Sequence, residues 1–159
     1  MEVKSRHHLR SDEIRDLEAI LEDALGVDLD GDAYERVDLV DTEFDLVLVD
    51  GEPHVFYVDG EPFLTVSGAN AHSPRRRVVT VDAGAIQFVS DGADVMRPGI
   101  VDADEDIDPG DLVAIVEETH GKALAVGRAL ESGADLVGDS GKVVESVHHV
   151  GDDLYEFSV

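Results

Sequence analysis

Residues 81–100 read VDAGAIQFVSDGADVMRPGI and carry the most informative pattern in the second half of the chain. The apolar run 78–81 before it predicts a β-strand, and Asp82 predicts the N-terminal cap of a helix. Apolar side chains recur on one face of that helix at helical spacing. They are Ile86, Val89 and Ala93. Because a further strand is expected at 94–96, the second half opens with a strand, a helix and a strand.

Toward the C-terminus, the chain shows short apolar runs separated by glycine-rich turns. Runs of four to eight apolar residues bounded by such turns are typical of β-strands. The expected strands are 112–117, 123–130, 143–149 and 154–157. Several short strands with one early helix predict a small β-barrel with a capping helix.

Toward the N-terminus, the pattern predicts a helix packed on a small antiparallel sheet. A β-like entry at 3–8 precedes Ser11, which caps a helix that Gly26 ends. Asp-Gly pairs, which favour tight hairpin turns, separate later strand-like runs. These runs are 34–40, 44–49, 54–58 and 62–66. The fold class expected from both halves is therefore α+β.

A change of composition marks the expected domain boundary. Residues 67–77 are polar and rich in loop-forming types, and the apolar periodicity lapses there before it resumes at Val78. We therefore expect an N-terminal α+β domain over 1–74 and a barrel domain over 75–159.

The chain is strongly acidic, with a formal net charge of −25 from 37 acidic and 12 basic residues. Such a charge ordinarily repels nucleic acid. The acids are, however, scattered along ordinary globular segments, and lysine occurs only at three positions. This pattern suits a cytosol of molar salt, where the screening length is roughly 3 Å. We infer a halophilic source and treat the acids as background.

The stretches that lack acids then become informative. Residues 62–81 contain no Asp or Glu, although 67–77 is loop-like and should carry them, and three successive arginines lie there. These are Arg75, Arg76 and Arg77. Their basicity indicates a binding partner.

Two further gaps each hold basic residues. Residues 95–101 contain Arg97, which we expect on the same face as the arginine triplet. Residues 119–130 contain His120, Lys122 and Arg128. For this last gap a buried strand, which excludes acids anyway, is the favoured explanation.

Other chemistries find little support in the sequence. Residues 138–142 lack the first glycine and the hydroxyl of a phosphate-binding loop. The acidic loops 28–32 and 102–108 lack the glutamate of a calcium loop. The paired histidines 7–8 and 148–149 point to opposite faces of their strands. There is no cysteine and no nucleophile elbow. We therefore expect no enzyme, cofactor or metal.

The apolar runs are too short to cross a bilayer, and residues 1–10 lack the continuous apolar stretch of a secretory signal. A cytoplasmic location is therefore expected.

Residues 81–89 and 92–100 together resemble the opening of a PUA domain. The version most similar is that of the malignant-T-cell-amplified family and its archaeal single-chain relatives, which share the turn written G-A-x-x-M-x-P-G. Residues 110–116, 123–127 and the pair Gly141-Lys142 fall where that family has barrel strands and a Gly-Lys turn. The resemblance covers 78–159, whereas the N-terminal half is similar in layout only. It implies a PUA-type β-barrel behind a pre-PUA domain.

The resemblance also implies RNA binding by the first barrel helix, the turn after it and nearby strands. Glycines there would let the RNA backbone approach, and Arg97 could grip a phosphate or stack on a base. Asp82 could instead be only a helix cap, Met96 only core and Gly99 only a turn. The residues carried over are Asp82, Gly84, Ala85, Met96, Arg97 and Gly99.

The family resemblance implies a translation factor that engages tRNA or the small ribosomal subunit in initiation or recycling. A partner like density-regulated protein, with an initiation-factor-like domain, is then plausible. Two alternatives stay open. One is an accessory RNA-binding subunit of a tRNA-modifying enzyme, such as a transglycosylase or pseudouridine synthase. The other is a protein-interaction module that has lost RNA binding.

Overall fold

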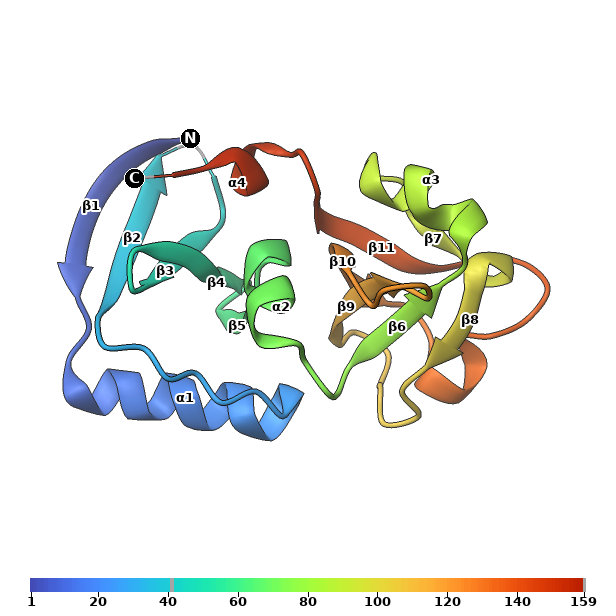
Figure 1. Ribbon diagram of the computed structural model, residues 1–159, viewed down its shortest axis with the longest axis horizontal. Coiled ribbons are helices and arrows are strands. Elements are labelled where there is room, and N and C mark those ends of the chain that lie inside the picture. The colour runs from blue at the N-terminus through green and yellow to red at the C-terminus, as the bar shows by residue number, and fades with distance from the viewer. Residues whose placement is uncertain (41, 159) are drawn as a thin grey trace.

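The computed structural model describes residues 1–40 and 42–158 as two β-sheets with helices packed against them (Figure 1). The first sheet is antiparallel throughout and follows chain order. Its strands are β1 (Glu2–His8), β2 (Tyr34–Val40), β3 (Asp45–Val49), β4 (Glu52–Val58) and β5 (Glu61–Leu64). Because each strand pairs with the next along the chain, tight hairpins suffice to connect most of them.

Helix α1 (Ser11–Leu25) lies against this sheet because its apolar residues share one face. Leu17, Leu21 and Leu25 are buried there. The helix ends as expected at Gly26, whose φ of 67° is left-handed. Ser11, the expected cap, is instead the first helical residue, and Arg10 takes the cap position, where its backbone N–H donates to the Glu13 carboxylate at 3.0 Å.

The second sheet has the order β7-β11-β10-β9-β6-β8, and within it β6 and β9 run parallel. Its strands are β6 (Val78–Val81), β7 (Val95–Met96), β8 (Ile100–Ala103), β9 (Leu112–Glu117), β10 (Ala123–Ala129) and β11 (Lys142–His149). The expected helix is a 3-10 turn, η1 (Ala83–Ala85), continued by α3 (Ile86–Ser90). Two more 3-10 turns are η2 (Arg97–Gly99) and η3 (Gly133–Asp135). A mixed fold with a barrel-type sheet is therefore confirmed.

Two further segments fold differently from expectation, and strand β8 was not expected at all. Residues 67–77 are not all loop, because α2 (Val66–His72) forms there with Thr65 as its cap. The Thr65 hydroxyl accepts a hydrogen bond from the N–H of Gly68 at 3.0 Å. Residues 154–157 are not a strand, because Asp152 caps the short helix α4 (Asp153–Glu156).

One hydrophobic core crosses from the first sheet into the barrel. Leu112, Ala123 and Val126 of the barrel belong to the same buried cluster as the first sheet. Leu154 of α4 joins this cluster too, and Figure 1 shows the chain after α4 running back toward the N-terminus. The expected boundary between 74 and 75 therefore stays a prediction, since the two sheets share a core.

Among the described residues, no helix combines the length and the apolar character needed to span a membrane.

Candidate nucleic-acid interface

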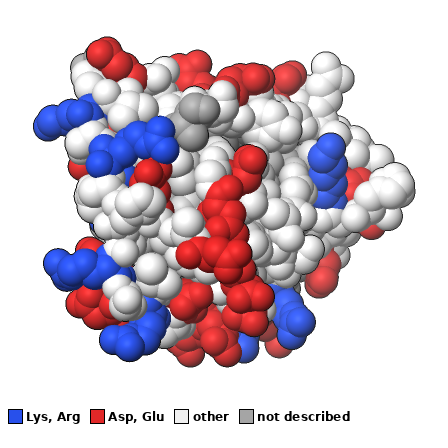
Figure 2. All heavy atoms as spheres, turned by 60° about the vertical axis from the view of Figure 1, so that its left-hand side comes forward, with Lys and Arg blue, Asp and Glu red and all other residues white. Residues whose placement is uncertain are grey.

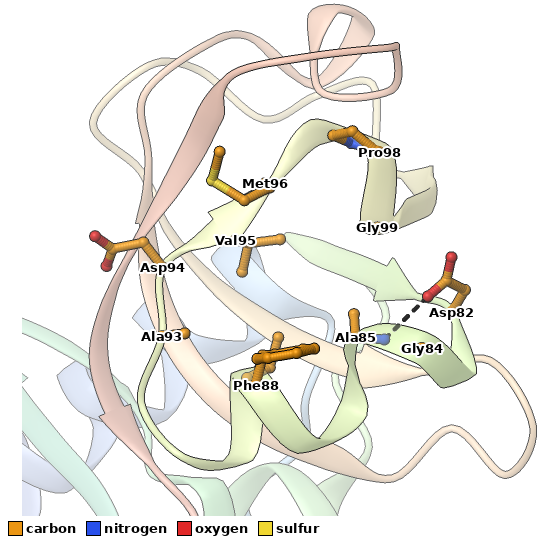
Figure 3. A pocket seen from close by; sticks show the side chains of 11 residues that line it. Asp82, Gly84, Ala85, Phe88, Ala93, Asp94, Val95, Met96, Pro98 and Gly99 are labelled. Carbon is orange, nitrogen blue, oxygen red and sulfur yellow. Dashed lines mark hydrogen bonds between the residues drawn. The ribbon is translucent and has the colours of Figure 1, made fainter.

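A pocket of about 410 Å³ lies between α3 and the turn after β7 (Figure 3). We call it the turn pocket. Its walls come from η1 and α3 on one side and from 93–99 on the other. The residues that line it are Asp82, Gly84, Ala85, Phe88, Val89, Ala93, Asp94, Val95, Met96, Pro98 and Gly99. All the residues that line the pocket therefore come from the stretch 81–100.

Local hydrogen bonding and close packing set the shape of the turn pocket. The Asp82 carboxylate accepts the N–H of Ala85 at 3.0 Å and so holds the entry to η1 (Figure 3). Gly99 passes close to Ala85, since a Cβ added to Gly99 would lie 3.2 Å from the Ala85 Cβ. The glycine therefore lets the two walls approach each other.

Two large apolar side chains of the turn pocket face solvent. Phe88 is 67% exposed and Met96 is 51% exposed. Exposing such side chains together costs burial energy, and clustered apolar exposure marks interaction sites. No lysine or arginine lines the pocket. The surface therefore suits a flat, uncharged group such as an unpaired base better than a phosphate.

Five of the six residues carried over from the family lie in the turn pocket. They are Asp82, Gly84, Ala85, Met96 and Gly99. Asp82 acts as a helix cap and lines the pocket at once, while the exposure of Met96 excludes a role as core only. Their contact with RNA stays a prediction.

Arg97, the sixth residue, is directed elsewhere. Its guanidinium donates to two backbone carbonyls, from Nε to Asp135 at 3.0 Å and from Nη1 to Ser140 at 2.6 Å. Gly138 leaves room for its stem, because a Cβ there would lie 2.5 Å from Arg97 Cδ. Arg97 therefore holds the loop that follows η3.

The arginine triplet contacts other elements. Arg76 Nη1 donates to the carbonyls of Glu22 and Asp23 near the C-terminus of α1. Arg77 is 3.7 Å from the Asp111 carboxylate. No hydrogen bond or ion pair of the described residues joins these arginines to Arg97. Their sharing one face stays a prediction.

Sequence reasoning missed Phe88, the most exposed aromatic residue of the pocket. The sequence predicts a helical face made of Ile86, Val89 and Ala93, and Phe88 does not lie on that face. Ala93 lies outside the helix, because α3 ends at Ser90. A phenylalanine at a position expected to face solvent is the signal that could have identified it.

Known proteins resemble this chain in two ways: some match the barrel half alone, and others match nearly the whole chain. Residues 77–151 match the family model described as the PUA domain. The uncharacterized protein MJ1432 of Methanocaldococcus jannaschii is 38% identical over 160 residues, 99% of each chain. The hypothetical protein PH0734.1 of Pyrococcus horikoshii has a solved structure with a TM-score of 0.84 and 30% identity, covering 98% of this chain and 100% of that one.

Other relatives match only part of this chain. Translation machinery-associated protein 20 of Saccharomyces cerevisiae is 39% identical over 88 residues, 51% of this chain and 49% of the yeast protein. This chain therefore matches about half the length of that relative. Archaeosine synthase of Haloferax volcanii is 48% identical over 63 residues, 40% of this chain but 10% of the synthase.

The Drosophila melanogaster homolog of malignant T-cell-amplified sequence 1 is 38% identical over 80 residues, 48% of this chain and 44% of the fly protein. The match over the barrel and the full-length archaeal relatives agree with the geometry of the fold. The chain belongs to the PUA-domain proteins related to malignant T-cell-amplified sequence 1 and translation machinery-associated protein 20.

Proposed function

We propose that this protein binds RNA of the translation apparatus through the turn pocket. The observation that carries the proposal is the exposure of Phe88 and Met96 beside a pocket in the PUA barrel. Membership of the PUA family supports RNA binding in general. The translation role rests on the names of the relatives in yeast and animals.

In the proposed complex, an unpaired base enters the turn pocket and stacks on Phe88. Base stacking on an aromatic ring contributes about 1–3 kcal/mol per base and tolerates different bases. Gly84 and Gly99 give the RNA backbone room to approach. Stacking does not depend on counterion release, so this mode of binding suits a high-salt cytosol.

We propose a binding role without catalysis. The two carboxylates of the turn pocket already have partners, because Asp82 accepts the N–H of Ala85 and Asp94 accepts the N–H of Ser146 at 2.8 Å. Lys142 Nζ lies 3.6 Å from Asp94 as well. Groups held in this way serve to shape a surface.

Cross-linking tests the translation role most directly. The RNA cross-linked to the protein in its native cells would be sequenced, with a Phe88→Ala variant as control. We expect tRNA or small-subunit ribosomal RNA, enriched over the control, and a cytoplasmic pool of the protein. Copurification of an initiation-factor-like partner would extend the proposal to initiation or recycling. Enrichment of neither RNA would contradict it.

A second candidate is an accessory RNA-binding subunit of a tRNA-modifying enzyme. The match to a segment of archaeosine synthase favours it, since that segment is 48% identical over 63 residues. In that case the cross-linked RNA would be tRNA alone, and the protein would copurify with a catalytic subunit.

A further inference from the structure

A second pocket lies across α3 from the turn pocket. Its volume is about 350 Å³, and it lies between α3, the hairpin that joins β9 to β10, and α4. We call it the hairpin pocket. The residues that form most of its wall are Ile86, Ser90, His120, Lys122, Leu124 and Tyr155.

The two pockets share α3 as a common wall. Phe88 and Val89 face the turn pocket, whereas Ile86 and Ser90 line the hairpin pocket. Because a helix with its side chains is about 10–12 Å across, an extended chain leaving one pocket could cross α3 and enter the other. A strand of RNA is an extended ligand that can do this.

The rim of the hairpin pocket carries one lysine and one histidine in a chain that is otherwise strongly acidic. The side chains of His120 and Lys122 belong to the acid-free stretch 119–130. No ion pair within the described residues involves Lys122, whereas Lys142 lies within 4.0 Å of two carboxylates. The ammonium group of Lys122 is therefore open to a phosphate.

One carboxylate, that of Glu117, lines the hairpin pocket, and it accepts hydrogen bonds from the backbone of the hairpin. Glu117 is 6% exposed, and its Oε1 accepts the N–H of Lys122 at 3.0 Å and the N–H of His120 at 2.6 Å. These backbone donors lower the pKa of Glu117. The carboxylate therefore keeps its negative charge, and both of its oxygens face the hairpin, since Oε2 lies 3.9 Å from His120 Nδ1.

An aromatic side chain completes the hairpin pocket. Tyr155 is half-buried, and its backbone N–H donates to the Asp152 carboxylate at 2.8 Å, which fixes the first turn of α4. Ile86 and Leu124 supply aliphatic surface in the same pocket. An aromatic ring, aliphatic walls and a basic rim are the parts with which proteins bind unpaired nucleotides.

We propose that the hairpin pocket is a second RNA-binding site, which takes a nucleotide beyond the one in the turn pocket. The RNA strand crosses α3, a base stacks on Tyr155, and the adjoining phosphate meets Lys122. This inference rests on the proposed function, because it extends the same RNA strand. The basic rim favours RNA over an apolar protein segment, which would gain nothing from Lys122.

The test compares binding of a short and a longer single-stranded RNA of mixed sequence by fluorescence polarisation in molar KCl. The variants are Lys122→Glu and Tyr155→Leu, which keeps an apolar side chain but loses the flat ring. Lys4→Glu is the matched control, since Lys4 lies in the fully exposed β1 of the other sheet. Phe88→Ala reports on the turn pocket, and thermal unfolding checks that each variant is folded.

We expect Lys122→Glu and Tyr155→Leu to bind the longer RNA roughly fivefold more weakly, with little change for the short RNA and none for Lys4→Glu. If Phe88→Ala weakens binding but both hairpin variants match Lys4→Glu, the second site is wrong and the proposed function stands. If the wild-type protein binds neither RNA, the proposed function fails as well. Should Tyr155→Leu not fold, Lys122→Glu alone decides the question.

Discussion

The ring of His148 in β11 accepts a hydrogen bond at Nε2 from the backbone N–H of Val66, 3.1 Å away at the start of α2. Because Nε2 accepts this bond, the ring proton belongs on Nδ1, which faces the Asp152 carboxylate at 2.9 and 3.0 Å. His148 is fully buried and packs edge-on against Phe56 at 5.5 Å. One side chain thus joins the barrel, the first sheet and α4.

Replacing His148 with alanine tests this junction. The change leaves the Val66 N–H without a partner and opens a cavity beside Phe56, so we expect a loss of about 2–4 kcal/mol in the free energy of unfolding. His7→Ala, at an exposed position of β1, is the control and should change stability by less than about 0.5 kcal/mol. Denaturant unfolding measures both. Equal stability of the two variants would show that the junction is unimportant.

Asp152 makes the same junction sensitive to acid. Burial opposes its ionisation, but hydrogen bonds from His148 and from the N–H groups of His149 and Tyr155 prevail and lower its pKa from 3.8. A lowered pKa in the folded state adds stability that is present above 3.8 and is lost as the pH falls through the folded value.

We therefore expect Asp152→Asn to be less stable than wild type at neutral pH, with the difference shrinking as the pH falls below 3.8. The measurement is denaturant unfolding at a series of pH values in molar KCl. Taking the difference between the two proteins cancels the other carboxylates. A difference that stays constant down to low pH would rule out this role for Asp152.

Replacing two glycines with alanine should have different effects, on stability at Gly68 and on RNA binding at Gly84. A Cβ at Gly68 would collide with the carbonyl oxygen of His54, so Gly68→Ala must push α2 away from β4. We expect a loss of about 1–3 kcal/mol, as in other overpacked cores. At Gly84 the nearest atom would be 3.4 Å away, so Gly84→Ala should fold normally and weaken RNA binding only by narrowing the turn pocket. Thermal unfolding and RNA binding, measured on both variants, check this contrast.

The variant Arg97→Lys distinguishes two roles of Arg97, one in holding the loop after η3 and one in contacting an RNA phosphate. Lysine keeps the charge but cannot reach the carbonyls of Asp135 and Ser140 with a fixed fork. We expect faster hydrogen exchange in 135–141 and a stability loss of about 1–2 kcal/mol. Unchanged exchange together with weakened RNA binding would instead favour direct contact with RNA.

The sequence predicted regular elements best where local pattern and tertiary packing agree. The strand expected at 34–40 is β2, with the same ends, because its apolar positions and its turns point the same way. Helix α2 escaped prediction because Ser67, Gly68 and Asn70 favour loops, and only the close approach of β4 makes small residues suitable there. Strand β8 at Ile100–Ala103 was missed too, since exposed Asp102 weakens its apolar pattern.

The C-terminal segment is a second case in which tertiary packing overrides the local sequence pattern. Leu154, Tyr155 and Phe157 have strand-forming side chains, yet Asp152 starts a helix and Leu154 turns into the core of the first sheet. For the candidate site, the family resemblance located five residues of the turn pocket, whereas the partners of Arg97 lie 38 and 43 residues away in sequence. Contacts over such separations leave no local pattern.

Binding of bulk tRNA and of small ribosomal subunits in molar KCl tests whether the turn pocket binds RNA by stacking. Wild type would be compared with Phe88→Ala and Met96→Ala, whose exposed side chains contribute little to stability. Ile20→Ala, an exposed apolar change on α1, is the control. We expect binding by wild type and the control, and roughly tenfold weaker binding by Phe88→Ala. Equal binding by all four proteins, or none by wild type, would contradict the claim.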